Sequence, residues 1–160
     1  MKDILIKRAE LDDAQAIMQV TKEAFEWYAK ASGAKETDAQ NEDCDTVKYD
    51  IQNKYVYCAY LNGILIGSLR VEINDTEQSA YLSRFGVLTE YRNLGVGKRL
   101  IFAVDSKMEQ LGVEKLYLHT STNISSLMTF YKNAGFLVHS VSKERGYPRA
   151  LLVKRYKIED

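Results

Sequence analysis

Apolar side chains recur at two spacings along this chain, and the change of spacing separates helices from strands. From Ala14 to Tyr28 they return every three or four residues, which predicts a helix with one apolar face. The same spacing predicts a helix over residues 97–111 and another over about 124–134. A shorter helix is expected around 46–52, after a polar loop. The pattern therefore predicts about four helices.

Segments rich in β-branched and aromatic residues fill the intervals between these helices. They predict seven strands, at about 4–6, 55–60, 64–73, 80–87, 115–120, 136–142 and 149–156. Asn62 and Gly63 favour a tight hairpin between the second and third. The strand–helix–strand unit in the middle predicts a right-handed parallel crossover. The expected fold is α/β, with a mixed, mostly antiparallel sheet of about seven strands flanked by about four helices.

Composition and charge narrow the function classes. The 160 residues, without repeat or linker, fit a single domain over 1–160. Basic and acidic side chains number 22 each, so no global charge draws the chain to nucleic acid or to a membrane. No apolar run approaches the ~20 residues that span a bilayer. The first residues are too short and charged for a signal peptide, so a cytoplasmic location is expected.

The cysteines and histidines of this sequence are not spaced like metal ligands. Cys44 and Cys58 form no metal-type pair and are too few for a disulfide scaffold, so both are expected to be reduced. His119 and His139 lie on predicted strands without a matching carboxylate spacing. We therefore expect no metal site.

The segment from Arg92 to Gly97 has the properties of an anion-binding turn. A strand ends before it and a helix begins within it, so backbone N–H groups without a partner face outward at the positive end of the helix dipole. Gly95 and Gly97 leave room for a ligand, and Lys98 adds charge. The simpler alternative is that these glycines only permit a tight turn and close helix packing.

Two nucleotide-binding motifs fit this turn poorly. A triphosphate-binding loop requires a glycine where Arg92 stands and a serine or threonine where Arg99 stands. A dinucleotide fingerprint requires a third glycine at Leu100. The remaining candidate for this turn is a phosphate or pyrophosphate group of another kind of ligand.

The same turn resembles the signature of the GNAT superfamily of N-acetyltransferases, Gln/Arg-x-x-Gly-x-Gly/Ala. It stands complete as Arg92-Asn93-Leu94-Gly95-Val96-Gly97. Downstream, Asn123, the pair Phe130-Tyr131 and the pair Gly135-Phe136 match further family features. The resemblance is specific over about residues 81–136 and architectural elsewhere. It implies a GNAT fold in which the fourth and fifth strands splay apart.

The resemblance also implies a site for acetyl-CoA as co-substrate. The end of the fourth strand would pair with the pantetheine arm through its backbone, and the turn would bind the pyrophosphate. Asn123 would contact the pantetheine region, although an asparagine there could equally cap the next helix. The implied cofactor-binding residues are Phe85, Gly86, Val87, Arg92, Asn93, Leu94, Gly95, Val96, Gly97, Lys98, Asn123, Ser126 and Tyr131.

Catalysis would need a proton donor and a proton acceptor. Tyr131 is the candidate general acid for the departing thiolate, since a phenol of pKa ~10 can protonate a thiol of pKa ~8.5. Its position on the apolar stripe also suits a core tyrosine. Many family members carry a glutamate on the fourth strand, but residues 80–87 contain no carboxylate. Glu72 is the best substitute base, and a water chain to bulk solvent is the alternative.

The expected function is transfer of an acetyl group to a primary amine. Trp27, Tyr28 and Tyr147 could form an aromatic wall for the acceptor, although Tyr28 also fits a core position. A small-molecule amine is favoured. A protein N-terminus or lysine, or a non-catalytic acyl-CoA sensor, is the alternative. The family often forms dimers, so the resemblance also implies a homodimer.

Overall fold

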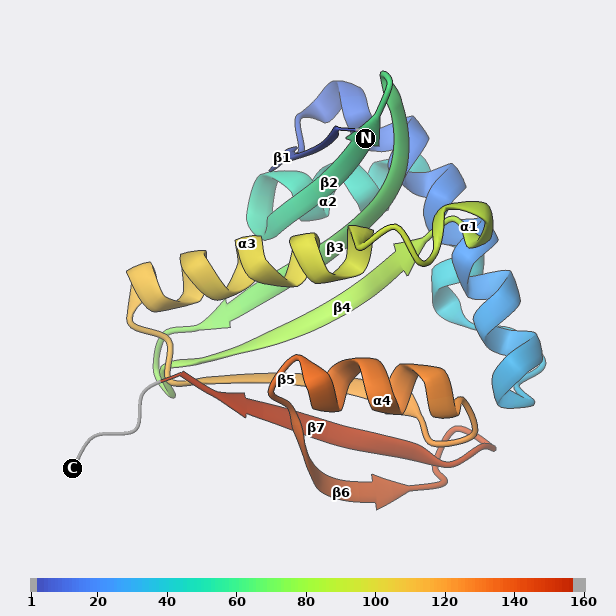
Figure 1. The fold of residues 1–160 in the computed structure, drawn as a ribbon, viewed down its shortest axis with the longest axis vertical. Coiled ribbons are helices and arrows are strands. Elements are labelled where there is room, and N and C mark those ends of the chain that lie inside the picture. The colour runs from blue at the N-terminus through green and yellow to red at the C-terminus, as the bar shows by residue number, and fades with distance from the viewer. Residues whose placement is uncertain (1–2, 157–160) are drawn as a thin grey trace.

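The computed structural model describes residues 3–156 and shows one seven-stranded sheet between two layers of helices (Figure 1). The strands are β1 (Ile4–Arg8), β2 (Tyr55–Leu61), β3 (Ile64–Asn74), β4 (Ser79–Val87), β5 (Lys115–Ser121), β6 (Leu137–Ser142) and β7 (Arg149–Arg155). The helices are α1 (Ala14–Ser32), α2 (Cys44–Asn53), α3 (Val96–Leu111) and α4 (Ser125–Asn133). The predicted α/β class with its mixed, mostly antiparallel sheet is confirmed.

The sheet has the order β1-β2-β3-β4-β5-β7-β6, and β4 with β5 is its parallel pair. The crossover through α3 that joins this pair is the one expected from the sequence. Three short 3₁₀ helices were not predicted: η1 (Leu11–Asp13), η2 (Asp38–Gln40) and η3 (Thr89–Tyr91). The first helix also continues to Ser32, where Gly33 ends it with φ 85°.

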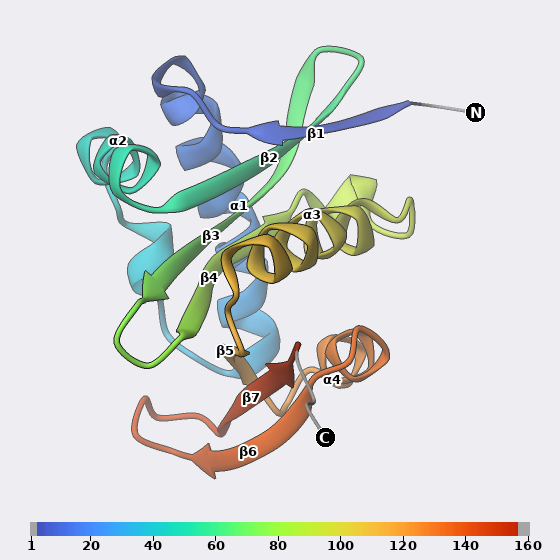
Figure 2. The same ribbon diagram turned by 90° about the vertical axis from the view of Figure 1, so that its left-hand side faces the viewer.

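Side chains along β2 point alternately to the two faces of the sheet, and each face is covered by a layer of helices. Tyr57 and Ala59 face a core that α3 completes with Leu100 and Val104. Their neighbours Val56 and Cys58 face the opposite side and meet residues of α1 and α2. Figure 2 shows the sheet nearly edge-on between α1 and α2 on one side and α3 and α4 on the other. Both cysteines are free, as expected.

The parallel pair separates soon after it begins. Ser79–Tyr81 pairs with Lys115–Tyr117, but β4 runs on to Val87 and β5 to Ser121 without further pairing between them. Arg84 has φ 53°, and the register of β4 against β3 shifts beside it, so β4 carries a bulge at this point. The sheet therefore opens between β4 and β5, as the family resemblance implies.

A buried ion cluster supports the β4 side of this opening. The Arg70 guanidinium on β3 is fully buried and contacts the carboxylates of Glu42 and Asp50, the latter at 3.0 Å. Glu42 also accepts a hydrogen bond from Arg84 Nε at 3.3 Å. We call these four residues the Arg70 cluster. The cluster ties the bulge of β4 to α2 and to the loop before α2.

Candidate active site

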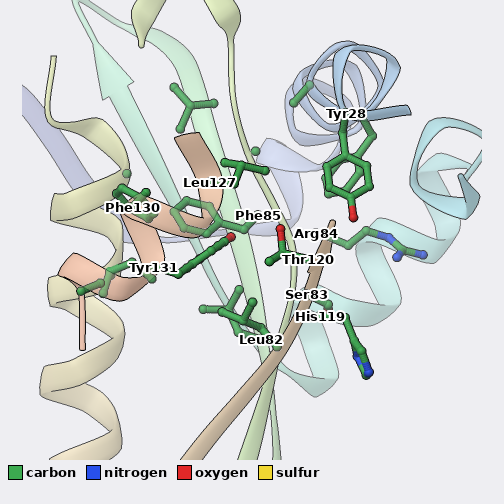
Figure 3. Close-up of a pocket in the computed structure, with 18 of the residues that line it drawn as sticks. Tyr28, Leu82, Ser83, Arg84, Phe85, His119, Thr120, Leu127, Phe130 and Tyr131 are labelled. Atoms are coloured by element: carbon green, nitrogen blue, oxygen red, sulfur yellow. The ribbon is translucent and has the colours of Figure 1, made fainter. Parts of the chain in front are cut away.

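A cleft of about 810 Å³ occupies the gap between β4 and β5. Its walls come from α1 and the loop after it, from β4, from the turn that begins α3, and from β5, α4 and the segment before β7. In Figure 3, Phe130 and Tyr131 lie at one end, which we call the α4 end. Tyr28, Arg84 and His119 lie at the other, which we call the α1 end. The cleft thus connects the two helical layers through the sheet.

The turn before α3 presents backbone donors to the cleft. Asn93 has φ 70° and Gly95 φ 80°, and the first α-helical bond runs from Arg99 N to Gly95 O at 3.1 Å. The N–H groups of the first helical turn, from Val96 to Lys98, therefore precede any intrahelical partner. Gly97 is needed for packing, because a Cβ there would lie 3.2 Å from the Phe130 ring. The predicted anion cradle has the backbone geometry that a phosphate requires.

Arg92 is held against this turn by an aromatic side chain from α1. Its guanidinium carbon lies 3.7 Å from the centroid of the Trp27 ring, and burial lowers the pKa of Arg92. Trp27 lines the cleft, but it stacks on Arg92 of the turn. Trp27 therefore supports the turn through Arg92, and its part in an acceptor wall stays a prediction.

Tyr131 lies in an aromatic cluster at the α4 end. Its ring contacts those of Phe85, Phe130 and Phe136, with centroids 6.2, 5.3 and 5.7 Å away. The side chain is 6% exposed, and burial raises the pKa of its phenol. Figure 3 shows the hydroxyl pointing into the cavity toward Thr120. The core and site interpretations of this tyrosine are thus compatible, since the ring packs while the hydroxyl faces the cleft.

Most of the residues predicted for the cofactor line the cleft. They are Phe85, Gly86, Val87, Arg92, Asn93, Gly95, Val96, Gly97, Lys98, Ser126 and Tyr131. Leu94 is not among the lining residues and is exposed. The structure therefore gathers this group at the predicted place, with two exceptions, Leu94 and Asn123.

Asn123 makes a contact that differs from both roles suggested by the sequence, which were pantetheine binding and helix capping. Its side-chain amide donates a hydrogen bond to the carbonyl of Ser32 at 2.8 Å, which ties the β5–α4 junction to the end of α1. Ile124, not Asn123, is the N-cap residue of α4, and it offers no side-chain cap. The amide is committed to α1, so Asn123 neither lines the cleft nor caps the helix.

Glu72 is placed outside the cleft. It lies on β3 opposite Tyr81, its side chain is 65% exposed, and its carboxylate is 3.9 Å from the Lys54 ammonium. The lining residues do not include it. The sequence could assign Glu72 to β3, but it could not show that this position is outside the cleft, because the cleft opens on the side of β4 away from β3. The expectation that Glu72 serves as the base is corrected on this ground.

A histidine and a tyrosine that the sequence did not select as catalytic lie in the cleft instead. His119 Nδ1 on β5 is 2.5 Å from the Tyr81 hydroxyl on β4, and both residues line the cleft. Burial lowers the pKa of His119 below its ordinary 6.5, and the charges of Arg149 and Arg145 lower it further, against a smaller opposing effect of Glu144. The imidazole is therefore neutral at pH 7 and able to accept a proton. The sequence offered one signal for this contact, because the predicted parallel crossover makes the strands that carry Tyr81 and His119 neighbours.

Two tyrosines close the α1 end. The hydroxyls of Tyr28 on α1 and Tyr147 before β7 are 3.1 Å apart, with ring centroids 6.1 Å apart. Burial raises the pKa of Tyr28, and the bond to Tyr147 adds to that rise. Both line the cleft. Their place beside an acceptor stays a prediction. Tyr28 and Phe25 are therefore cleft residues on a helix whose earlier apolar residues pack in the core.

Two further features of the described chain bear on the chemistry. Within residues 3–156 no three His, Cys, Asp or Glu side chains gather closely enough to hold a metal ion. Over the same residues no helix has both the length and the apolar character needed to cross a bilayer.

Comparisons with known proteins agree with this geometry. The sequence matches the acetyltransferase (GNAT) family over residues 16–136. It is 31% identical to N-alpha-acetyltransferase 50 of Danio rerio over 88 residues, which are 53% of this chain and 52% of that one. It is 32% identical to the probable N-acetyltransferase san of Drosophila melanogaster over 94 residues, covering 57% and 50%. The chain thus spans about half the length of these curated relatives.

Among solved structures, the PaiA N-acetyltransferase of Thermoplasma acidophilum, in complex with coenzyme A, has a similar fold. Its TM-score is 0.81 at 20% sequence identity, over 96% of this chain and 99% of that chain. At this identity the similarity concerns the fold alone.

Proposed function

The chain belongs to the GNAT family of acetyltransferases, and from this membership we propose that it transfers an acetyl group from acetyl-CoA to a primary amine of a small molecule. One observation carries the proposal. The cleft joins an anion cradle and a buried tyrosine at one side to a neutral, hydrogen-bonded histidine at the other. Transfer from a CoA thioester to an amine can use these features as a pyrophosphate site, a proton donor and a proton acceptor in one continuous space.

The residues present fit acetyl-CoA. The turn from Arg92 to Lys98 offers backbone N–H groups and two cationic side chains for a pyrophosphate. The free edge of β4, from Phe85 to Val87, offers main-chain groups for the amides of the pantetheine arm. Acetyl-CoA supplies an activated acetyl thioester whose carbonyl carbon an amine can attack.

His119 is proposed as the proton acceptor. A primary amine attacks only when neutral, so one proton must leave the nitrogen as the new N–C bond forms and the C–S bond breaks. The imidazole of His119 is neutral and lines the cleft. In the tautomer that carries its hydrogen on Nδ1, this N–H donates to the Tyr81 hydroxyl oxygen, and Nε2 keeps the lone pair that accepts the proton of the amine. The carboxylate absent from β4 is thereby replaced by a side chain of β5.

Tyr131 is proposed as the proton donor to the departing sulfur, and the variant Tyr131→Phe tests it. We expect kcat to fall about tenfold to a hundredfold at neutral pH. The loss is moderate because a thiolate of pKa ~8.5 can leave without full protonation. Acetyl-CoA binding should persist, since the ring packing against Phe85, Phe130 and Phe136 is retained. Unchanged turnover would remove Tyr131 from the mechanism.

Binding of acetyl-CoA is the first test of the proposal. At a concentration about 100 times the dissociation constant, the ligand should stabilise the fold by about 2.7 kcal/mol, which thermal unfolding measures. Gly97→Val should abolish most of this gain, because a Cβ already approaches Phe130 within 3.2 Å. Ser106→Val, at an exposed position of the same helix, controls for the β-branched substitution. Absence of stabilisation in the unaltered protein would overturn the proposal.

A protein N-terminus is the second candidate acceptor, and the similarity to an N-alpha-acetyltransferase favours it. The bond between Tyr28 and Tyr147 favours a small amine, since it joins α1 to the segment before β7 across the α1 end. A mass-shift screen with acetyl-CoA, a set of small primary amines and a set of peptides decides between them. Binding without any acetylated product would instead indicate a non-catalytic acyl-CoA sensor.

A further inference from the structure

Three arginines gather at the α1 end of the cleft. Arg84 comes from β4, Arg145 from the turn before β7 and Arg149 from the first position of β7, and all three line the cleft. Burial raises the pKa of Tyr81, and the charges of these three guanidinium groups oppose that rise. Their charges therefore act at the Tyr81 hydroxyl, which is hydrogen-bonded to His119.

Arg149 is the most exceptional of the three. Its Nε is buried and has no hydrogen-bond partner. Among residues 3–156 its guanidinium makes no ion pair, and neither does that of Arg145. A buried donor without a partner is costly, because it has lost its water without gaining another acceptor. Arg149 therefore has hydrogen-bonding capacity that a ligand in the cleft could use.

Neighbouring acids neutralise this charge only in part. Glu144 opposes Arg149 and Arg145 at His119, but its effect on the pKa of His119 is smaller than theirs. Glu42, the partner of Arg84, is already bound to the buried Arg70. The acidic residues of the described cleft wall are Asp38, which is exposed, and Asp105. Asp105 is engaged by the Lys154 ammonium at 2.6 Å and by the Tyr156 hydroxyl at 2.7 Å. The α1 end consequently has an excess of positive charge.

We propose that the acceptor amine carries an anionic group, in the simplest case a carboxylate, which binds Arg149 and Arg145 while the amine faces His119. The inference rests on the acetyltransferase function proposed above. A carboxylate matches the planar fork of a guanidinium and would satisfy the buried Nε. The same positive charge disfavours the protonated form of a nearby amine, so the site also promotes the neutral nucleophile. A polyamine, by contrast, is repelled.

Two sources can supply this chemistry, a small amino acid and a protein N-terminus with an acidic side chain. The experiment measures kcat/KM for matched pairs that differ only in the anion. One pair is γ-aminobutyrate with γ-aminobutyramide. The other is a tetrapeptide with aspartate in second place and its twin with asparagine there, and spermidine serves as the cationic amine. We expect the anionic member of at least one pair to react about tenfold faster or more, and the pair with the larger ratio identifies the source.

Variants connect that preference to the arginines. Arg149→Gln should reduce the anionic preference to near unity, and Arg145→Gln, in an exposed turn where folding is not at risk, should reduce it in part. Arg155→Gln removes the same charge from an exposed position of β7 outside the cleft and should leave the preference unchanged. Three outcomes would overturn this inference but not the proposed function. They are turnover of amines without any anionic preference, a preference for spermidine, and an anionic preference that survives both cleft variants. No turnover of any amine overturns the proposed function itself.

Discussion

Replacing His119 with alanine is expected to lower kcat about a thousandfold, the middle of the range for loss of a general base. The imidazole is neutral at pH 7, lines the cleft, and has its Nδ1 fixed by Tyr81 at 2.5 Å. Without it, the proton of the attacking amine must pass to water. Steady-state kinetics with saturating acetyl-CoA measure the effect.

The chain provides a matched control for this variant. His139 lies on the edge strand β6, is exposed, and does not line the cleft. His139→Ala should therefore leave kcat unchanged. Tyr81→Phe should give a smaller loss than His119→Ala, because it releases the orientation of the ring but keeps the base. If His119→Ala kept kcat within about threefold of the unaltered protein, proton transfer by this residue would be excluded.

The pH dependence gives an independent readout of the same residue. A protonated imidazole cannot accept a proton, so the rate rises with pH through the pKa of His119. Burial first, and then the charges of Arg149 and Arg145, lower that pKa below 6.5, while Glu144 opposes them. This limb of kcat/KM should therefore lie below pH 6.5 and disappear in His119→Ala, which leaves only the limb of the acceptor amine.

Replacing Arg70 with methionine is expected to lower the free energy of unfolding by about 3–5 kcal/mol. Arg70 is 0% exposed, and its partners Glu42 and Asp50 are only 5% and 10% exposed. Without the guanidinium, two carboxylates remain in a poorly solvated environment, where Arg84 and Lys54 compensate them only in part, at 3.3 Å each. Chemical denaturation followed by circular dichroism measures the loss.

Two further variants separate the buried charge from a general effect of substitution. Combining Arg70→Met with Glu42→Gln and Asp50→Asn should recover a large part of the stability, because neutral amides cost less to bury than unpaired carboxylates. Glu72→Gln removes an exposed carboxylate 3.9 Å from Lys54 and should change stability by less than about 1 kcal/mol. A loss for Arg70→Met no larger than that for Glu72→Gln would contradict the assigned role of the Arg70 cluster.

The sequence by itself determined the features that depend on neighbouring residues. The helical spacing from Ala14 onward predicted α1, although its end at Ser32 was missed, and the Arg92–Gly97 signature predicted the turn at the start of α3. Each of these is governed by contacts a few residues apart, where side-chain period and glycine conformation act directly. Periodicity alone placed Tyr131 on the apolar stripe of its helix, and its role as a proton donor came from the family resemblance and stays a prediction.

The tertiary structure alone decided which side chains meet across the cleft. Tyr81 and His119 are 38 residues apart, Asn123 and Ser32 are 91 apart, and Tyr28 and Tyr147 are 119 apart. Their encounters depend on strand register and on the bulge at Arg84, and a shift of one residue would turn each strand side chain to the opposite face. No local pattern contains that information. For this reason the sequence indicated Glu72 as the base, while the fold brought His119 and three arginines to the site.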